Sequence, residues 1–267
     1  MFGAIIGDIA GSAYERLPHL GLSRLESKDF NLFPQKARFT DDTVLTVAVA
    51  EALMDSTDFK SRFKKYVRME PKRGYGQRFA EWAISPTGVP YNSFGNGSAM
   101  RVSPVAWYLD DLEEVESMAT ESAECTHNHP EGIKGAVVTA ACILLARQGQ
   151  GKEAIRNYAI DAGYDMNRTV QSIRESGYTF DVTCQGSVPE AIIAFLESGS
   201  YEDAIRNAIF LGGDADTQGA ITGSIAEAFY GGVPSELKKK AQEFLTGPIQ
   251  KVADEFDTEY VQPKLGQ

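Results

Sequence analysis

The sequence has few cysteines and no excess of basic residues, and each of these shortages excludes a class of protein. Its 267 residues contain only three cysteines, Cys125, Cys142 and Cys184, an odd number without a CxxC pair. A disulfide framework is therefore not expected, and a reducing, cytoplasmic setting fits better. Lysine and arginine number 26 against 37 aspartates and glutamates, which gives a net charge of −11. This acidity argues against binding to nucleic acid or to anionic lipid, since both require an excess of positive charge.

Long hydrophobic runs are also missing. No stretch approaches the roughly 18 apolar residues of a membrane-spanning helix. The first 13 residues are apolar, but Asp8 interrupts them and no basic segment precedes them, so they do not form a signal peptide. Hydrophobic residues make up 43% of the chain and charged residues 24%, which is an ordinary balance for a globular protein. We expect a soluble, cytoplasmic protein without a membrane partner.

Most of the chain follows the hydrophobic period of an α-helix. No stretch of four or more residues alternates apolar and polar side chains between turn signals, as a half-buried strand would. No linker or low-complexity tract divides the chain. We therefore predict an all-α fold, a compact helical bundle in which residues 1–267 form a single domain. The expected helices span residues 2–13, 44–53, 59–69, 73–83, 112–124, 131–148, 152–163, 167–176, 189–197, 201–210 and 217–230, and the last helices lie within 235–256.

The first expected helix carries two distinct stripes. Gly3, Gly7 and Gly11 recur four residues apart, which would let another helix approach closely along that line. Because each glycine costs a helix about 1 kcal/mol relative to alanine, three of them need a packing reason. Asp8 shares a different face with Ser12 and Glu15, at i, i+4 and i+7.

Two expected helix starts are unusually acidic. The segment 40–43 reads Thr-Asp-Asp-Thr, and the segment 212–217 reads Gly-Gly-Asp-Ala-Asp-Thr. Either one alone fits N-capping, because aspartate and threonine accept hydrogen bonds from the unpaired N–H groups of a first helical turn. A cap needs only one such side chain, however, whereas the two segments together offer four aspartates and several threonines before helices that are apolar enough to be buried.

Buried carboxylates at this density require compensation by positive charge. Neither segment contains lysine or arginine. Divalent cations such as Mg²⁺ and Mn²⁺ prefer carboxylate, hydroxyl and carbonyl oxygens, whereas zinc prefers histidine and cysteine, which both segments lack. The pair of segments therefore favours a site for two hard divalent cations, with Asp214 and Asp216 bridging toward Asp41 and Asp42.

Five motifs, in order along the chain, resemble the ADP-ribosylglycohydrolase family. They are residues 3–15 (GAIIGDIAGSAYE), 39–43 (FTDDT), 95–101 (GNGSAMR), 126–127 (TH) and 212–223 (GGDADTQGAITG). The resemblance extends nearly from end to end. It implies an all-α fold, a dinuclear Mg²⁺ or Mn²⁺ centre and recognition of ADP-ribose. One departure is Gln218, where many members of the family carry an apolar residue.

The resemblance also assigns residues to roles. Glu15 and Asp41 are candidates for the catalytic base or positioning group, and the sequence does not choose between them. The segment 96–101 would wrap the diphosphate and the distal ribose, and His127 would lie near the ligand. The implied metal ligands are Thr40, Asp41, Asp42, Asp214, Asp216 and Thr217, and the candidate substrate-binding residues are Phe94, Gly95, Asn96, Gly97, Ser98, Met100 and His127.

The function that follows is hydrolysis of the glycosidic bond at C1″ of ADP-ribose, which releases it from a modified protein or a small-molecule conjugate. Two alternatives stay open: a magnesium-dependent hydrolase of nucleotide-like phosphoesters, and a non-catalytic ADP-ribose-binding protein. The motifs do not identify the acceptor from which ADP-ribose is removed. His127 and His129 lie two residues apart, but without a cysteine or a third histidine nearby they make a weak case for zinc.

Overall fold

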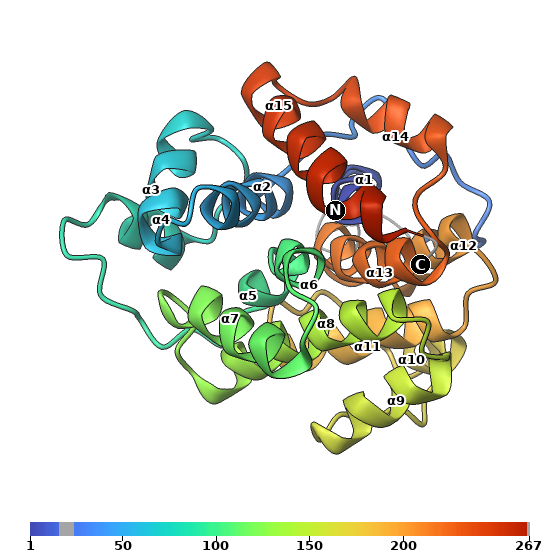
Figure 1. Ribbon diagram of the computed structural model, residues 1–267. Coiled ribbons are helices and arrows are strands. Elements are labelled where there is room, and N and C mark those ends of the chain that lie inside the picture. The colour runs from blue at the N-terminus through green and yellow to red at the C-terminus, as the bar shows by residue number, and fades with distance from the viewer. Residues whose placement is uncertain (16–23, 266–267) are drawn as a thin grey trace.

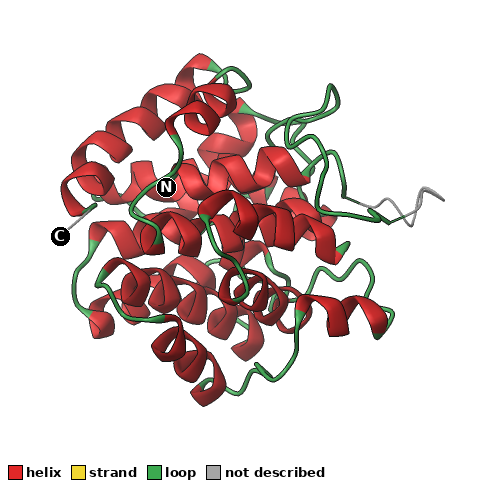
Figure 2. Cartoon of the chain, turned by 90° about the vertical axis from the view of Figure 1, so that its right-hand side faces the viewer, coloured by secondary structure: helices red, strands yellow, loops and turns green. Residues whose placement is uncertain are grey.

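The computed structural model describes residues 1–15 and 24–265, and helices dominate both ranges (Figures 1 and 2). The first helices are α1 (Phe2–Gly11), α2 (Asp41–Met54), α3 (Phe59–Met69), α4 (Gln77–Ile84), α5 (Gly97–Met100), α6 (Ser103–Tyr108), α7 (Leu112–Glu124) and α8 (Pro130–Arg147). They are followed by α9 (Lys152–Asp161), α10 (Val170–Glu175), α11 (Cys184–Leu196), α12 (Tyr201–Leu211), α13 (Ala215–Phe229), α14 (Ser235–Gln242) and α15 (Gly247–Phe256). A π-helical turn, η1 (Asp257–Val261), and a 3₁₀ turn, η2 (Gln262–Lys264), end the described chain.

The all-α prediction is confirmed. Within the two described ranges there is no β-strand, only an isolated antiparallel bridge between Gly95 and Thr183. No helix in these ranges combines the length and the apolar character that crossing a bilayer requires.

The centre of the bundle is the pair of helices α1 and α13, which lie side by side (Figure 1). All ten residues of α1 are buried, and so are all residues of α13 except Phe229. The sequence predicts that another helix approaches the glycine stripe of α1 closely, and in the structure this helix is α13. A Cβ atom added to Gly7 would overlap the Gly219 carbonyl, and one added to Gly219 would overlap the Gly7 carbonyl. The two backbones therefore touch, and this contact fixes the distance between their acidic side chains.

Several helices begin and end where capping and periodicity place them. The Asp58 side chain accepts a hydrogen bond from the Ser61 amide and so caps α3, and Asp111 caps α7 through the Glu114 amide in the same way. Helix α3 then buries one apolar face, including Phe59 and Phe63, and leaves its basic face in solvent. Both helices have the bounds that the sequence predicts.

Two expected helices begin four or more residues away from the expected start. Helix α4 begins at Gln77 and not at residue 73, because Gly74 adopts a φ of +99° that a right-handed helix does not allow. Helix α11 begins at Cys184, five residues before the expected start, and contains Pro189 inside it. The segment 235–256 contains the last helices, as expected: α14 and α15, separated by residues 243–246.

Candidate functional site

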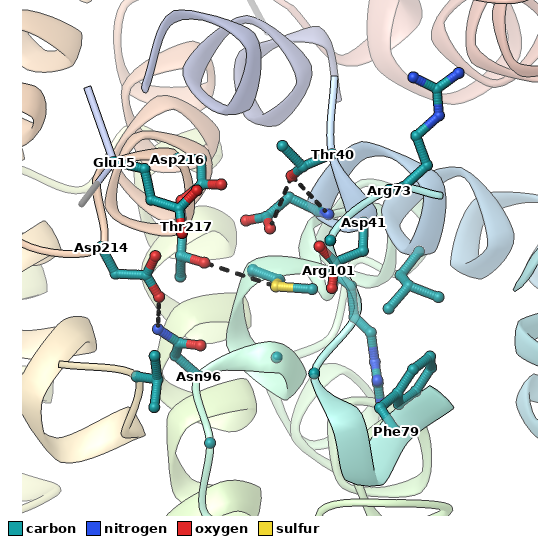
Figure 3. Close-up of a pocket in the computed structure, with 18 of the residues that line it drawn as sticks. Glu15, Thr40, Asp41, Arg73, Phe79, Asn96, Arg101, Asp214, Asp216 and Thr217 are labelled. Atoms are coloured by element: carbon teal, nitrogen blue, oxygen red, sulfur yellow. Dashed lines mark hydrogen bonds between the residues drawn. The ribbon is translucent and has the colours of Figure 1, made fainter. Parts of the chain in front are cut away.

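A cavity of about 650 Å³ opens where the starts of α2 and α13 approach the end of α1. Most of the site residues expected from the sequence line it. These are Glu15, Thr40, Asp41, Asp42, Gly95, Asn96, Gly97, Met100, His127, Asp214, Asp216 and Thr217. Figure 3 shows Glu15, Asp214 and Asp216 on one side of the cavity and Thr40 and Asp41 on the other. Segments that are more than 170 residues apart in the sequence, 40–42 and 214–217, thus meet at one place.

The two acidic helix starts differ in how they use their side chains. Thr40 is the N-cap of α2, and its hydroxyl accepts a hydrogen bond from the Asp42 amide at 3.3 Å. Asp214 occupies the N-cap position of α13 but makes no capping hydrogen bond. Its carboxylate accepts instead from the Asn96 side chain at 2.7 Å. N-capping therefore explains Thr40 and leaves the carboxylates at the start of α13 unexplained.

The carboxylates gather into two groups that share one member. One oxygen each from Asp8, Asp42 and Asp216 lie within 4.8 Å of one another, and so do oxygens from Glu15, Asp214 and Asp216. Asp216 belongs to both groups, so the two positions are adjacent. Asp8, Asp42, Asp214 and Asp216 are all buried, whereas Glu15 is partly exposed.

Burial and mutual repulsion raise the pKa values of these carboxyl groups. Loss of hydration is the largest cause for Asp41, and the negative charge of Asp8 adds to it, so that the pKa of Asp41 rises to about 8. Burial raises the pKa of Asp42 and of Asp216 well above the usual range, and the neighbouring aspartates raise it further. Such a group of like charges is costly to keep ionised unless positive charge lies between its members.

The donor set fits hard divalent cations. Aspartate, glutamate and threonine oxygens are the ligands that Mg²⁺ and Mn²⁺ prefer. In the described structure Oδ1 of Asp42 is buried and has no hydrogen-bond partner, which is expected of an oxygen reserved for a cation. Of the ligands expected from the sequence, Asp42, Asp214 and Asp216 belong to these two carboxylate groups. Asp41 belongs to neither group and lines the same cavity, as do Thr40 and Thr217.

The glycine-rich loop before α5 is tied to the acidic cluster. The Asn96 side chain donates to Ser187 at 2.9 Å as well as to Asp214, so it joins the loop to the starts of α11 and α13. Ser98 lies outside the cavity lining, because its buried hydroxyl donates to the Gly132 carbonyl at 2.7 Å. Phe94 lies outside it too, with 44% of its surface exposed and its ring edge-on to His129.

His127 lines the cavity as a neutral side chain. Burial lowers its pKa well below the ordinary value, and the nearby charges of Arg101 and Arg78 lower it further. Its Nδ1 lies 2.7 Å from the Thr126 hydroxyl, and its ring lies against Gly97. His129 faces elsewhere: it caps α8 through the Glu131 amide. Among the described residues, neither histidine belongs to a group of three or more side chains that could hold a metal ion.

Several residues in the cavity or beside it were not predicted as site residues from the sequence. Asp8 lies in the carboxylate group with Asp42 and Asp216. The only indication of this in the sequence was that Asp8 shares a helix face with Glu15. Basic residues that lie outside both acidic motifs line the same cavity, among them Lys36, Arg38, Arg73 and Arg78. Their sequence positions carry no common spacing that could have revealed them. The net acidic protein therefore presents local positive charge beside its carboxylates, which suits an anionic ligand.

Comparison with known proteins decides the family. The sequence model of the ADP-ribosylglycohydrolase family matches residues 1–265. The chain belongs to the ADP-ribosylglycohydrolase family. A solved structure titled "ADP-ribosylglycohydrolase-related protein complex" superimposes with a TM-score of 0.73 at 25% identity, and the match covers 97% of this chain and 96% of that one.

Similar proteins of known activity are hydrolases. ADP-ribosylhydrolase ARH3 from Mus musculus is 26% identical, with 91% of this chain and 86% of the relative covered. The ADP-ribosyl-[dinitrogen reductase] glycohydrolase of Rhodospirillum rubrum is 25% identical, with 94% and 92% covered. ADP-ribosylarginine hydrolase Tri1 from Pseudomonas putida is 27% identical, with 96% and 76% covered. This family member is accordingly an ADP-ribosyl hydrolase, as the motifs imply.

Proposed function

We propose that this hydrolase removes ADP-ribose from a protein side chain or small-molecule conjugate and that it uses two Mg²⁺ or Mn²⁺ ions. One observation carries the proposal: two carboxylate groups share Asp216 at the wall of a cavity that also holds the Gly95–Gly97 loop. When bound, the cations would supply the positive charge that the carboxylates lack and would orient the ribose hydroxyls. An adjacent pair of such positions is typical of two-metal hydrolases.

The reaction joins a water oxygen to C1″ of the ribose and breaks the bond from C1″ to the acceptor. The departing acceptor atom gains a proton, and the water loses one to a carboxylate. Glu15 and Asp41 both face the cavity and are the candidates for this base. Lys36, Arg38 and Arg78 supply the positive charge that the diphosphate needs, whereas Arg73 is ion-paired with Glu70 at 2.7 Å.

An activity screen tests the proposal. The metal-loaded protein is incubated with peptides carrying ADP-ribose on arginine, on serine and on an acyl ester, and free ADP-ribose is measured by chromatography. We expect release of ADP-ribose from at least one substrate, loss of release after exhaustive chelation, and recovery on adding Mg²⁺ or Mn²⁺. Full activity after chelation would contradict the metal requirement. Inorganic phosphate as the product would point to a phosphoester hydrolase, and no product from any substrate would favour a non-catalytic ADP-ribose-binding protein.

A further inference from the structure

Asp8 lies in the middle of α1 and is completely buried, yet its contacts are with the start of α2. Its Oδ1 accepts a hydrogen bond from the Thr40 hydroxyl at 2.7 Å. Its Oδ2 accepts from the Thr40 amide at 2.9 Å and from the Thr43 amide at 3.1 Å. The Thr43 hydroxyl donates to the same oxygen. One carboxylate on α1 therefore holds two residues of α2.

The threonine hydroxyl is the important partner. A hydroxyl has one hydrogen and two lone pairs, so it can present a lone pair to a cation only if its hydrogen points to another acceptor. Two acceptors compete for the hydrogen of Thr40: Oδ1 of Asp8 at 2.7 Å and Oδ2 of Asp42 at 3.3 Å. The shorter hydrogen bond goes to Asp8. One lone pair of the Thr40 oxygen, which also accepts the Asp42 amide at 3.3 Å, and the Asp42 carboxylate are then available to a cation.

Most of the acceptor capacity of Asp8 is taken by α2. Each carboxylate oxygen offers about two lone-pair positions. Oδ2 accepts three hydrogen bonds, from the Thr40 amide and from the amide and hydroxyl of Thr43, and Oδ1 accepts the Thr40 hydroxyl. Its closeness to Asp42 and Asp216 thus comes from its contact with α2 and does not require that it bind the ion directly.

We propose that Asp8 is a positioning residue that takes the hydrogen of the Thr40 hydroxyl and so turns its oxygen toward the cation site. The inference rests on the proposed metal-dependent function. Helix α1 then has a second role beside packing. Its glycines contact α13, and its Asp8 orients Thr40 at the start of α2. Partners of this kind, which orient a metal ligand without touching the metal, typically change metal affinity by about 10- to 100-fold when they are removed.

The test measures Mn²⁺ binding to metal-free protein by isothermal titration calorimetry. Asp8→Asn keeps the size of the side chain but places an amide donor either against the three donors that point at Oδ2 or against the Thr40 hydroxyl that points at Oδ1. We expect its Kd for Mn²⁺ to rise by about 10- to 100-fold. Glu227→Gln is the matched control, because Glu227 is an equally buried carboxylate that accepts the Gly3 amide at 2.9 Å at the other end of α1. It should lower Tm and leave the Kd for Mn²⁺ within about twofold, since Glu227 has no contact with the cation site.

A double-mutant cycle separates positioning from direct ligation. If Asp8 acts through Thr40, then Asp8→Asn combined with Thr40→Val should bind Mn²⁺ no more weakly than Thr40→Val alone. Additive losses would overturn the inference, and so would an unchanged Kd for folded Asp8→Asn. Should the variants fail to fold, a crystal structure of the Mn²⁺-loaded wild-type protein decides: Thr40 Oγ1 in the coordination shell supports the inference, and an Asp8 oxygen there refutes it. Wild-type protein that binds no Mn²⁺ would overturn the proposed function and this inference together.

Discussion

Asp216→Asn should reduce the release of ADP-ribose by about 100- to 1000-fold or more, the scale on which losing one preorganised electrostatic group slows an enzyme. Asp216 is the one carboxylate common to both groups, so the substitution removes charge from both candidate cation positions at once. The change should also weaken Mn²⁺ binding. Turnover by this variant under saturating metal is measured with the substrate that the activity screen identifies.

The same substitution should stabilise the metal-free protein, which separates loss of function from unfolding. Burial and the neighbouring carboxylates raise the pKa of Asp216 in the folded protein well above its usual value of 3.8. Above pH 3.8 the Asp216 carboxyl group loses its proton in the unfolded chain, whereas in the folded protein it keeps the proton to a higher pH. The free energy of unfolding of the wild type therefore falls as the pH rises. Without metal, Asp216→Asn should therefore have the higher Tm at pH 8, and a smaller difference near pH 4. Unimpaired turnover, or a lower metal-free Tm at pH 8, would contradict this interpretation.

Gly7→Ala should destabilise the protein by about 3 kcal/mol, the upper end of the range for overpacked cores. In an exposed helix the same change would stabilise by about 1 kcal/mol, because alanine favours helices. Here the new methyl group would meet the backbone of Gly219, which cannot rotate away as a side chain can. For a chain of this size the loss corresponds to a fall in Tm of about 6–12 °C.

Gly247→Ala is the control for this prediction. Gly247 is the first residue of α15, and a Cβ added there meets no atom within 4 Å. We expect its Tm to equal that of the wild type or to rise slightly, measured by circular dichroism in parallel with Gly7→Ala. If Gly7→Ala is as stable as the wild type, the contact between α1 and α13 is not the tight backbone contact described above.

The sequence predicts those parts of the fold that depend on local signals. The bounds of α3 and α7 follow from Asp58 and Asp111, whose side chains cap the first turn, and from the apolar period behind them. The glycine stripe of α1 indicates a close helix partner but does not identify it. That partner is α13, which contacts α1 through Gly219 and Gly223. The spacing of glycines alone does not show which helix of the chain packs against α1.

Features that depend on tertiary contacts were not predictable. The start of α11 is missed because Pro189 reads as a helix start, whereas Thr183 caps the helix earlier through the Gly186 amide. In the site, the motifs indicate the acidic residues of α2 and α13, but the role of Asp8 emerges only when its hydrogen bonds to Thr40 are seen. The place of Ser98, whose hydroxyl is held by Gly132, also depends on the packing of α5 against α8.

We propose that carboxylates from the starts of α2 and α13 together hold a pair of cations that bind the ribose. The most direct test is an electron paramagnetic resonance titration of Mn²⁺ into metal-free protein, followed by ADP-ribose. We expect saturation at two Mn²⁺ per chain, a spectrum of two interacting ions, and a change in that spectrum when ADP-ribose is added. A signal of free aqueous Mn²⁺ from the first addition onward, unaffected by ADP-ribose, would contradict it.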